Sequence, residues 1–170
     1  MKRPHYILLP VNTWFITLSL VIAFLLNLLP WGQRIGVPDF VALALLFWNT
    51  HQPRKVGIGI AFVLGILTDV HHASLLGEHA LAYTILSFGA ITLHKRVCWF
   101  PLAAQIFHVL PLLILSHLTP FMVRLIAGAP FPGWAYLSGS FVEALLWPVT
   151  TFILLAPQRR AIDPDDTRPI

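Results

Sequence analysis

The side chains best suited to chemistry are three acids set in strongly apolar sequence. Asp39, Asp69 and Glu143 each lie within or beside a long apolar run. An ionisable side chain in such surroundings is costly, so it marks either a functional group or a required structural contact. The two aspartates could form a proton relay, an ion site or an acid/base pair, or they could fix the helices. Because Asp39 follows Pro38 at an expected helix start, where a carboxylate accepts free backbone N–H groups, a capping role accounts for it.

A second group of candidate residues combines acids with histidines. It contains, in order, Asp69, His71, His72, Glu78 and His79. These side chains have metal-ligand chemistry, but adjacent helical histidines point in different directions and no HExxH pair is present. We therefore expect no metal and no cofactor. His108 and His117 are expected to make polar contacts between helices.

Signals for catalysis are weak. Ser138-Gly139-Ser140 resembles part of a G-x-S-x-G motif, but no histidine follows on a later helix to serve as its base. The glycine-rich stretch from Gly57 to Gly65 is apolar and lacks the lysine of a phosphate-binding loop. We predict that the protein is not an enzyme and has no catalytic residue, with an enzyme that uses Asp69 and His71 or His72 as an alternative.

Composition determines the elements that must position these residues. The 170-residue chain is 57% hydrophobic and only 11% charged, with a net charge of +4. A single soluble core cannot bury so much apolar surface, whereas a bilayer can. The basic residues form short pairs between apolar runs rather than a stripe, which argues against nucleic acid binding. The lipid bilayer is therefore the expected environment.

Six apolar segments are long enough to be transmembrane helices. We place them at Leu8–Leu29, Gly36–Thr50, Val56–Val70, Leu76–Leu93, Cys98–Ala127 and Trp134–Ala156. The first is too long for a signal peptide, and Pro111 and Pro120 predict a kink or a break in the fifth. The sequence therefore predicts an all-α polytopic membrane protein with one six-helix transmembrane domain at 1–160 and a short disordered tail at 161–170.

The basic residues predict the orientation, because Lys and Arg concentrate in cytoplasmic loops. In a six-helix arrangement, one side carries Lys2, Arg3, Arg54, Lys55, Lys95, Arg96, Arg159, Arg160 and Arg168, and the other only Arg34 and Arg124. An odd number of helices would remove this asymmetry. Both termini are therefore predicted to be cytoplasmic.

This topology assigns depths to the ionisable residues. Asp39 and Asp69 are expected near the outer face, where Arg124 is the basic residue available to pair with them. Glu143 is expected roughly 13 Å into the sixth helix, near the midplane. It has no visible partner in the sequence, so a protonated carboxyl bonded to another helix and a functional acid both remain open.

Small residues recur every four positions along the third helix. Gly57, Ala61 and Gly65 precede Asp69 at this spacing, which lets another helix backbone approach closely. Two interpretations remain open, namely internal packing and a docking groove for a partner's helix.

The chain resembles the bacterial rod shape-determining protein MreD family over most of its length. The matching residues are Leu29-Pro30-Trp31, Pro38, Phe47-Trp48, Pro53, Val56-Gly57-Ile58-Gly59, Phe62, Gly65, Leu67, Asp69, Leu76-Gly77, Ala80-Leu81 and Leu146-Trp147-Pro148. The order Gly, Phe, Gly, Leu, Asp, then Leu-Gly is the most specific part. Relatives often have asparagine where this chain has Asp39, which weakens an acid role there.

The resemblance implies a non-enzymatic scaffold of the cell-elongation machinery in the bacterial inner membrane. It implies that MreC is the main partner, bound through its transmembrane helix. Indirect partners would be MreB, a shape-elongation glycosyltransferase and a class B penicillin-binding protein. The implied fold is similar to substrate-binding subunits of energy-coupling vitamin transporters. A small-molecule-binding subunit of a transporter is the alternative function, although Ala23 alone represents the A-x-x-x-A face expected on its first helix.

Overall fold

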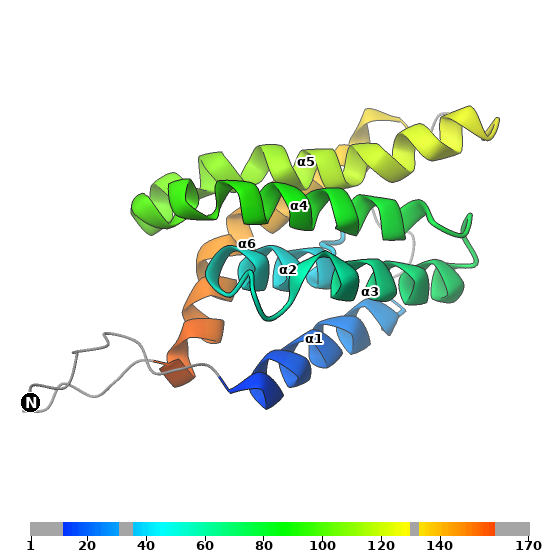
Figure 1. Ribbon diagram of the computed structural model, residues 1–170. Helices are drawn as coiled ribbons and strands as arrows, with labels where there is room; N and C mark the ends of the chain where they lie inside the picture. The colour runs from blue at the N-terminus through cyan, green and yellow to red at the C-terminus, as the bar shows by residue number, and fades with distance from the viewer. Residues whose placement is uncertain (1–11, 31–35, 130–132, 159–170) are drawn as a thin grey trace, which may run out of the picture.

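The computed structural model describes residues 12–30, 36–129 and 133–158, and every regular element within them is helical (Figure 1). The elements are α1 (Thr13–Leu28), α2 (Phe40–His51), α3 (Gly57–His72), α4 (Glu78–Trp99), α5 (Leu102–Ile126), the 3₁₀ turn η1 (Trp134–Leu137), α6 (Ser138–Leu155) and η2 (Ala156–Gln158). The predicted all-α fold with six helices is confirmed. Residues 8–11 of the first predicted segment, Arg34 and the tail at 161–170 lie outside the described residues.

Several predicted helix boundaries differ from the structure, including the starts of α2 and α6, which lie at Phe40 and Ser138 instead of Gly36 and Trp134. α4 continues to Trp99 instead of ending at Leu93, and α5 begins soon afterwards at Leu102. α5 also passes through Pro111 and Pro120 as one helix, so of the predicted kink or break, the break does not occur and the kink stays a prediction. α5 packs against α4 on one side and α6 on another. Neighbouring helices of this kind let a membrane helix tolerate the backbone groups that proline frees.

The helices differ in how much of a bilayer they could cross. Among the described residues, Leu102–Ile126 and Trp134–Gln158 are long and apolar enough to cross a membrane by length and composition. α1, α2 and α3 are apolar but shorter. The 12 residues of α2 measure about 18 Å at 1.5 Å per residue, against a hydrocarbon core of about 30 Å. Six complete crossings therefore stay a prediction.

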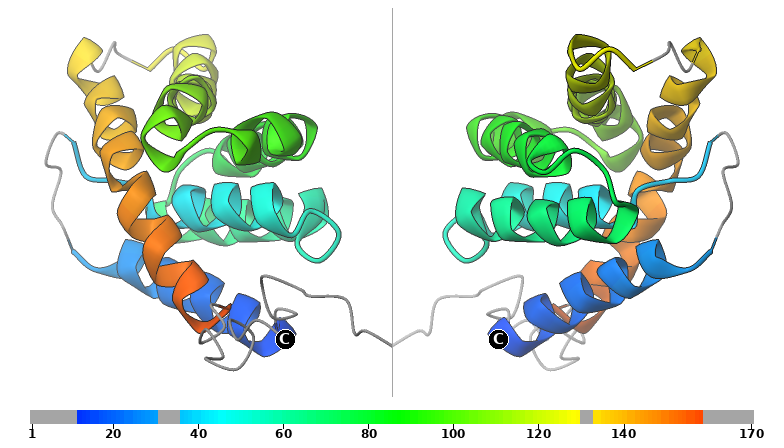
Figure 2. Two further views of the ribbon diagram at one scale, coloured as in Figure 1. Left: turned by 90° about the vertical axis from the view of Figure 1, so that its left-hand side faces the viewer. Right: turned by 90° about the vertical axis from the view of Figure 1, so that its right-hand side faces the viewer.

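The helix directions alternate along the chain (Figure 1). α4 is central and packs against α2, α3 and α5, while α6 runs obliquely from beside α5 to beside α1 (Figure 2). Arg54 and Lys55 follow α2, and Lys95 and Arg96 lie at the end of α4, at the same end of the bundle (Figure 1). Arg124, near the end of α5, lies at the opposite end. The described basic residues therefore lie at the ends of the bundle that the predicted alternation of six helix directions assigns to them.

The small residues of α3 face α4 within the same chain. A Cβ atom added to Gly65 would lie 2.2 Å from the Cα atom of Ala80, so the two backbones are in direct contact there. Ala61 and Asp69 have no exposed surface. Gly65 and Asp69 are therefore covered by α4, and Ala61 is buried within the bundle. None of the three can also receive a partner's helix, which corrects the docking interpretation at these positions. Gly57 is half-buried, with an open space at its Cα.

We predict that Gly65→Ala strongly destabilises the protein, because the added methyl group meets backbone that cannot move alone. Gly59→Ala is the matched control on the same helix, since nothing lies within 4 Å of its added Cβ. Alanine is also the better helix former by about 1 kcal/mol. Thermal unfolding of both variants in detergent checks the prediction. Equal melting temperatures for Gly65→Ala and wild type would contradict the close α3–α4 contact.

Candidate functional site

The start of α2 lies inside the bundle, where its backbone N–H groups need partners. Residues 37–39 are not helical, so side chains must supply the acceptors that a preceding turn would provide. Glu143 Oε1 accepts the N–H of Asp39 at 2.7 Å, and Asn27 Oδ1 accepts that of Phe40 at 3.0 Å. Asp39 Oδ1 accepts the N–H of Ala42 at 3.0 Å, which confirms its capping role. Three side chains thus complete the first turn of α2.

Further contacts connect this helix start to the rest of the bundle. Asn27 Nδ2 donates to Asp39 Oδ1 at 2.7 Å, and the Tyr83 hydroxyl donates to Asp39 Oδ2 at 2.5 Å. His117 Nε2 lies 3.4 Å from Glu143 Oε1. We refer to these five residues, Asn27, Asp39, Tyr83, His117 and Glu143, as the α2-start cluster. It joins α1, α2, α4, α5 and α6 at one point.

The α2-start cluster gives Glu143 the partner that the sequence did not show. Glu143 is the sixth residue of α6, about 8 Å from the start of the helix at 1.5 Å per residue. Its carboxyl group contacts the backbone of Asp39, so it is not alone, and its depth near the midplane stays a prediction. The side chain is fully buried, as expected. The prediction counted from Trp134, but residues 134–137 form the separate turn η1.

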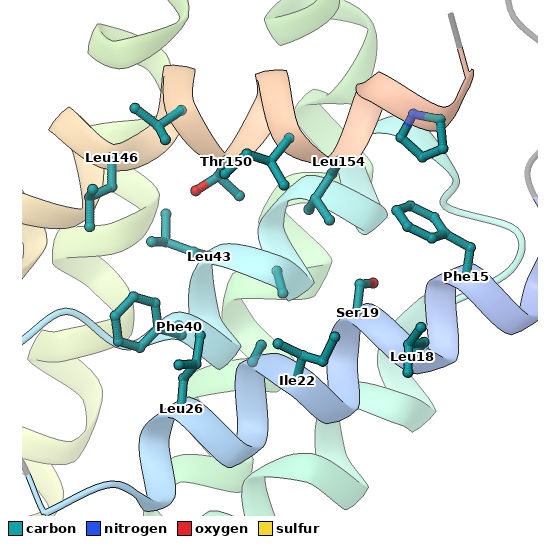
Figure 3. Close-up of a pocket in the computed structure, with 15 residues that line it drawn as sticks. Phe15, Leu18, Ser19, Ile22, Leu26, Phe40, Leu43, Leu146, Thr150 and Leu154 are labelled. Atoms are coloured by element: carbon teal, nitrogen blue, oxygen red, sulfur yellow. The ribbon is translucent and has the colours of Figure 1, made fainter.

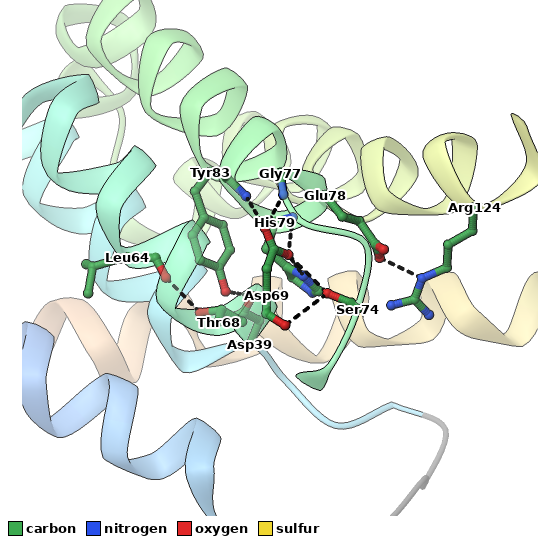
Figure 4. Close-up of polar contacts among 11 residues, drawn as sticks. Asp39, Leu64, Thr68, Asp69, Ser74, Gly77, Glu78, His79, Tyr83 and Arg124 are labelled. Carbon is green, nitrogen blue, oxygen red and sulfur yellow. Dashed lines mark hydrogen bonds and ion pairs between the residues drawn. The ribbon is translucent and has the colours of Figure 1, made fainter. Parts of the chain in front are cut away.

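A second polar cluster surrounds Asp69 and completes the start of α4 (Figure 4). Asp69 Oδ2 accepts the N–H of Gly77 at 2.8 Å, and Oδ1 accepts the N–H of His79 at 2.8 Å. Oδ1 also accepts from the His79 ring at 2.8 Å and from the Ser74 hydroxyl at 3.1 Å. The carboxylate also meets the positive end of the α4 dipole. Asp69 therefore acts as a cap supplied from the preceding helix, and we name Asp69, Ser74, Gly77 and His79 the α4-start cluster.

The two aspartates bind α4 one turn apart, through His79 and Tyr83. No direct contact joins them among the described residues. Arg124, which was expected to pair with one of them, instead contacts Glu78, with Nε 2.6 Å from Oε1. Glu78 is 1% exposed and Arg124 36%. The end of α5 lies beside the start of α4, so Arg124 contacts Glu78 in the first turn of α4.

The remaining histidines of this region lie at its surface. His71 and His72 are exposed, and the His72 ring centre lies 5.4 Å from that of His79. Desolvation and the nearby His79 and His71 rings lower the pKa of His72, the last residue of α3. Within the described residues, no three metal-ligating side chains converge. The absence of a metal in the functional protein stays a prediction.

An apolar groove of about 380 Å³ opens between α1 and α6, with α2 as its floor (Figure 3). Its described lining includes Leu18, Ile22 and Ile153, and among these described residues only the hydroxyls of Ser19 and Thr150 are polar side-chain groups. Ser19 Oγ already accepts from Trp48 Nε1 at 2.8 Å. The groove therefore suits apolar groups and offers almost nothing to a polar metabolite.

Two members of the α2-start cluster, Asn27 and Tyr83, were not among the residues predicted from the sequence. Asn27 lies at the end of the first apolar run, where a polar side chain is itself a signal of an internal contact. Tyr83 gives no such signal, because an isolated tyrosine in an apolar helix is common. His117 was expected to make a polar contact between helices, and its approach to Glu143 confirms this.

We predict that Asp69→Asn lowers stability and that Asp69→Ala lowers it further. Asparagine keeps one acceptor oxygen but turns its amide group toward backbone N–H donors. Alanine removes every acceptor, and each buried donor left unpaired costs about 1–3 kcal/mol. Melting temperatures of purified variants check this order, with exposed His72→Ala as the control. An Asp69→Ala variant as stable as wild type would contradict the cap.

Arg124→Gln should destabilise the protein by about 1–3 kcal/mol, because it leaves the buried Glu78 carboxylate without its partly exposed counter-charge. In the double variant Glu78→Gln/Arg124→Gln, the second change should cost much less, since no charge remains to compensate. Arg96→Gln, at the exposed end of α4, controls for the loss of a positive charge alone. Additive effects in a double-mutant cycle of melting measurements would argue against this pairing.

Comparisons with known proteins agree with the resemblance seen in the sequence. The family model described as rod shape-determining protein MreD matches residues 10–157. The chain is 35% identical over 156 residues to the rod shape-determining protein MreD of Haemophilus influenzae, covering 88% of this chain and 93% of that protein. No solved structure matches. The comparison with vitamin-transporter subunits therefore stays a prediction, and the chain belongs to the MreD family of rod shape-determining proteins.

Proposed function

We propose that this protein is a scaffold of the cell-elongation machinery that binds the transmembrane helix of MreC. Membership of the MreD family makes it a non-enzymatic, shape-determining membrane protein. The finer proposal is that it crosses the inner membrane six times, with both termini in the cytoplasm. Through MreC it would help couple MreB filaments to the glycosyltransferase and the class B penicillin-binding protein that build peptidoglycan.

The scaffold proposal rests on one observation, namely that the three acids within the bundle bind backbone N–H groups of the protein itself. Asp39, Asp69 and Glu143 all accept backbone N–H groups at helix starts. A general acid or base needs access to a substrate proton, whereas these carboxyl groups are half-buried or buried and already bonded. Their arrangement supports a rigid body that presents fixed helix faces to other membrane proteins.

The outward faces of the helices are the surfaces available to MreC. Ala61, Gly65 and Asp69 face α4, so a partner on α3 would have to use the opposite side, where Val63 is 58% exposed. The groove between α1 and α6 is the other candidate, with Ile22 on one rim and Ile153 on the other. Both surfaces are apolar, which suits a helix within the bilayer.

The groove is also the observation that favours the alternative, a small-molecule-binding subunit of a transporter. Its volume falls within the range of ligand pockets. Its few polar groups favour an apolar ligand over a charged or hydroxylated one. Binding of a purified small molecule at stoichiometric amounts, with no requirement for MreC in cells, would support this alternative.

We expect the protein to co-purify with MreC and to crosslink to it from exposed positions. A photo-crosslinking residue would replace Val63, Ile22 or Ile153 in turn, in cells with and without MreC. Ala61 is the matched buried control, from which no MreC crosslink is expected. Failure to co-purify, together with no MreC-dependent crosslink from any exposed helix face, would overturn the proposal.

A further inference from the structure

The pair formed by His117 and Glu143 has an unusual arrangement of hydrogen-bonding groups. His117 Nδ1 lies 3.2 Å from the carbonyl oxygen of Leu113, and Nε2 lies 3.4 Å from Glu143 Oε1. Both oxygens are acceptors, yet a neutral imidazole carries only one N–H. If only one proton lies in these two contacts, the ring nitrogen without a proton turns its lone pair toward an oxygen lone pair. For both contacts to be hydrogen bonds, the pair needs one proton more than a neutral histidine and an ionised glutamate supply together.

The surrounding charges lead to the same requirement. Asp39 accepts from Asn27, Ala42 and Tyr83, three donors that suit an ionised carboxylate. An ionised Glu143 would place a second negative charge on the backbone N–H of that same residue. Two buried carboxylates without a cation are costly.

No cation from the described chain is in contact with this pair. Among the described residues, the ionisable groups that face it are Asp39 beside α2, Tyr83 and His79 on α4, and Tyr136 in η1. Arg124 is engaged with Glu78. Glu143 Oε2 is buried without a hydrogen-bond partner. A proton is thus the charge available to balance the pair.

We propose that Glu143 and His117 form a buried site that binds one proton at neutral pH, and that this proton fastens α5 and α6 to the start of α2. The proton resides on His117 Nε2, giving an imidazolium beside a carboxylate, or on Glu143, giving a carboxylic acid beside a neutral ring. In both forms, Glu143 Oε1 continues to accept the N–H of Asp39. Loss of the proton leaves two facing lone pairs and a second negative charge, which loosens the start of α2.

Folding then takes up a proton, because the unfolded chain at neutral pH has an ionised glutamate and a largely neutral histidine. Stability must therefore fall as pH rises. One proton changes the unfolding equilibrium constant by up to about tenfold per pH unit. Glu143→Gln removes the negative charge, and its carbonyl oxygen in the place of Oε1 can still accept the N–H of Asp39 and an N–H from a neutral His117 ring. This variant should fold and lose that pH dependence.

The direct test determines the protonation of the wild-type protein in lipid nanodiscs at pH 7. Infrared spectroscopy detects a protonated carboxyl group, and Glu143→Gln assigns its band. Nitrogen-15 NMR of labelled histidines detects an imidazolium. His108 is the internal reference on the same helix, because its Nδ1 also faces the carbonyl four residues earlier, at 3.1 Å, while its ring stacks on Phe100.

Either a protonated Glu143 or a charged His117 supports the proposal. An ionised Glu143 together with a neutral His117 overturns it, and so does a pair that holds two added protons. Melting temperatures between about pH 7 and 9 give a second readout. They should fall for wild type more steeply than for Glu143→Gln, and equal slopes would contradict a stabilising role for the proton.

Discussion

The structure depends on satisfying backbone N–H groups where helices begin inside an apolar bundle. In a bilayer no water is available to these groups, and each one left unpaired costs several kcal/mol. α2 begins after an extended segment, and α4 begins after a short turn. In both places a carboxylate from elsewhere in the chain completes the first turn, namely Glu143 for α2 and Asp69 for α4. The acids that were candidates for a catalytic role thus serve as acceptors for backbone N–H groups at the starts of these helices.

This constraint explains several features together. Gly65 lets α3 and α4 touch, and one turn later the same close approach brings Asp69 to the α4 start. Gly139 has a similar role in α6, because a Cβ there would lie 3.0 Å from His117 Nε2 and 3.3 Å from the carbonyl oxygen of Val37. The Ser138-Gly139-Ser140 stretch therefore lets α6 approach the residues before α2, which accounts for the glycine without a catalytic role.

The proposed role as a scaffold requires that the helix faces presented to partners be fixed in position. The α2-start cluster links five of the six helices through side chains, and the contact between Glu78 and Arg124 ties the end of α5 to α4. These internal contacts fix the relative positions of the helices that form the apolar groove and the face of α3 that points away from α4. A partner helix would meet preformed surfaces, which reduces the ordering cost of binding.

The sequence by itself determined the helical class, the six helices and their approximate limits, because long apolar runs and paired basic residues are local signals. It also identified Asp39 as a cap, since proline followed by an acid at a helix start is a local pattern. Only the tertiary structure decided which groups meet. The contact of Arg124 with Glu78, the placement of Glu143 on the N–H of Asp39, and the burial of Ala61 and Gly65 against α4 join residues distant in sequence. Spacing along one helix shows which residues share a face, but it does not show which helix covers that face.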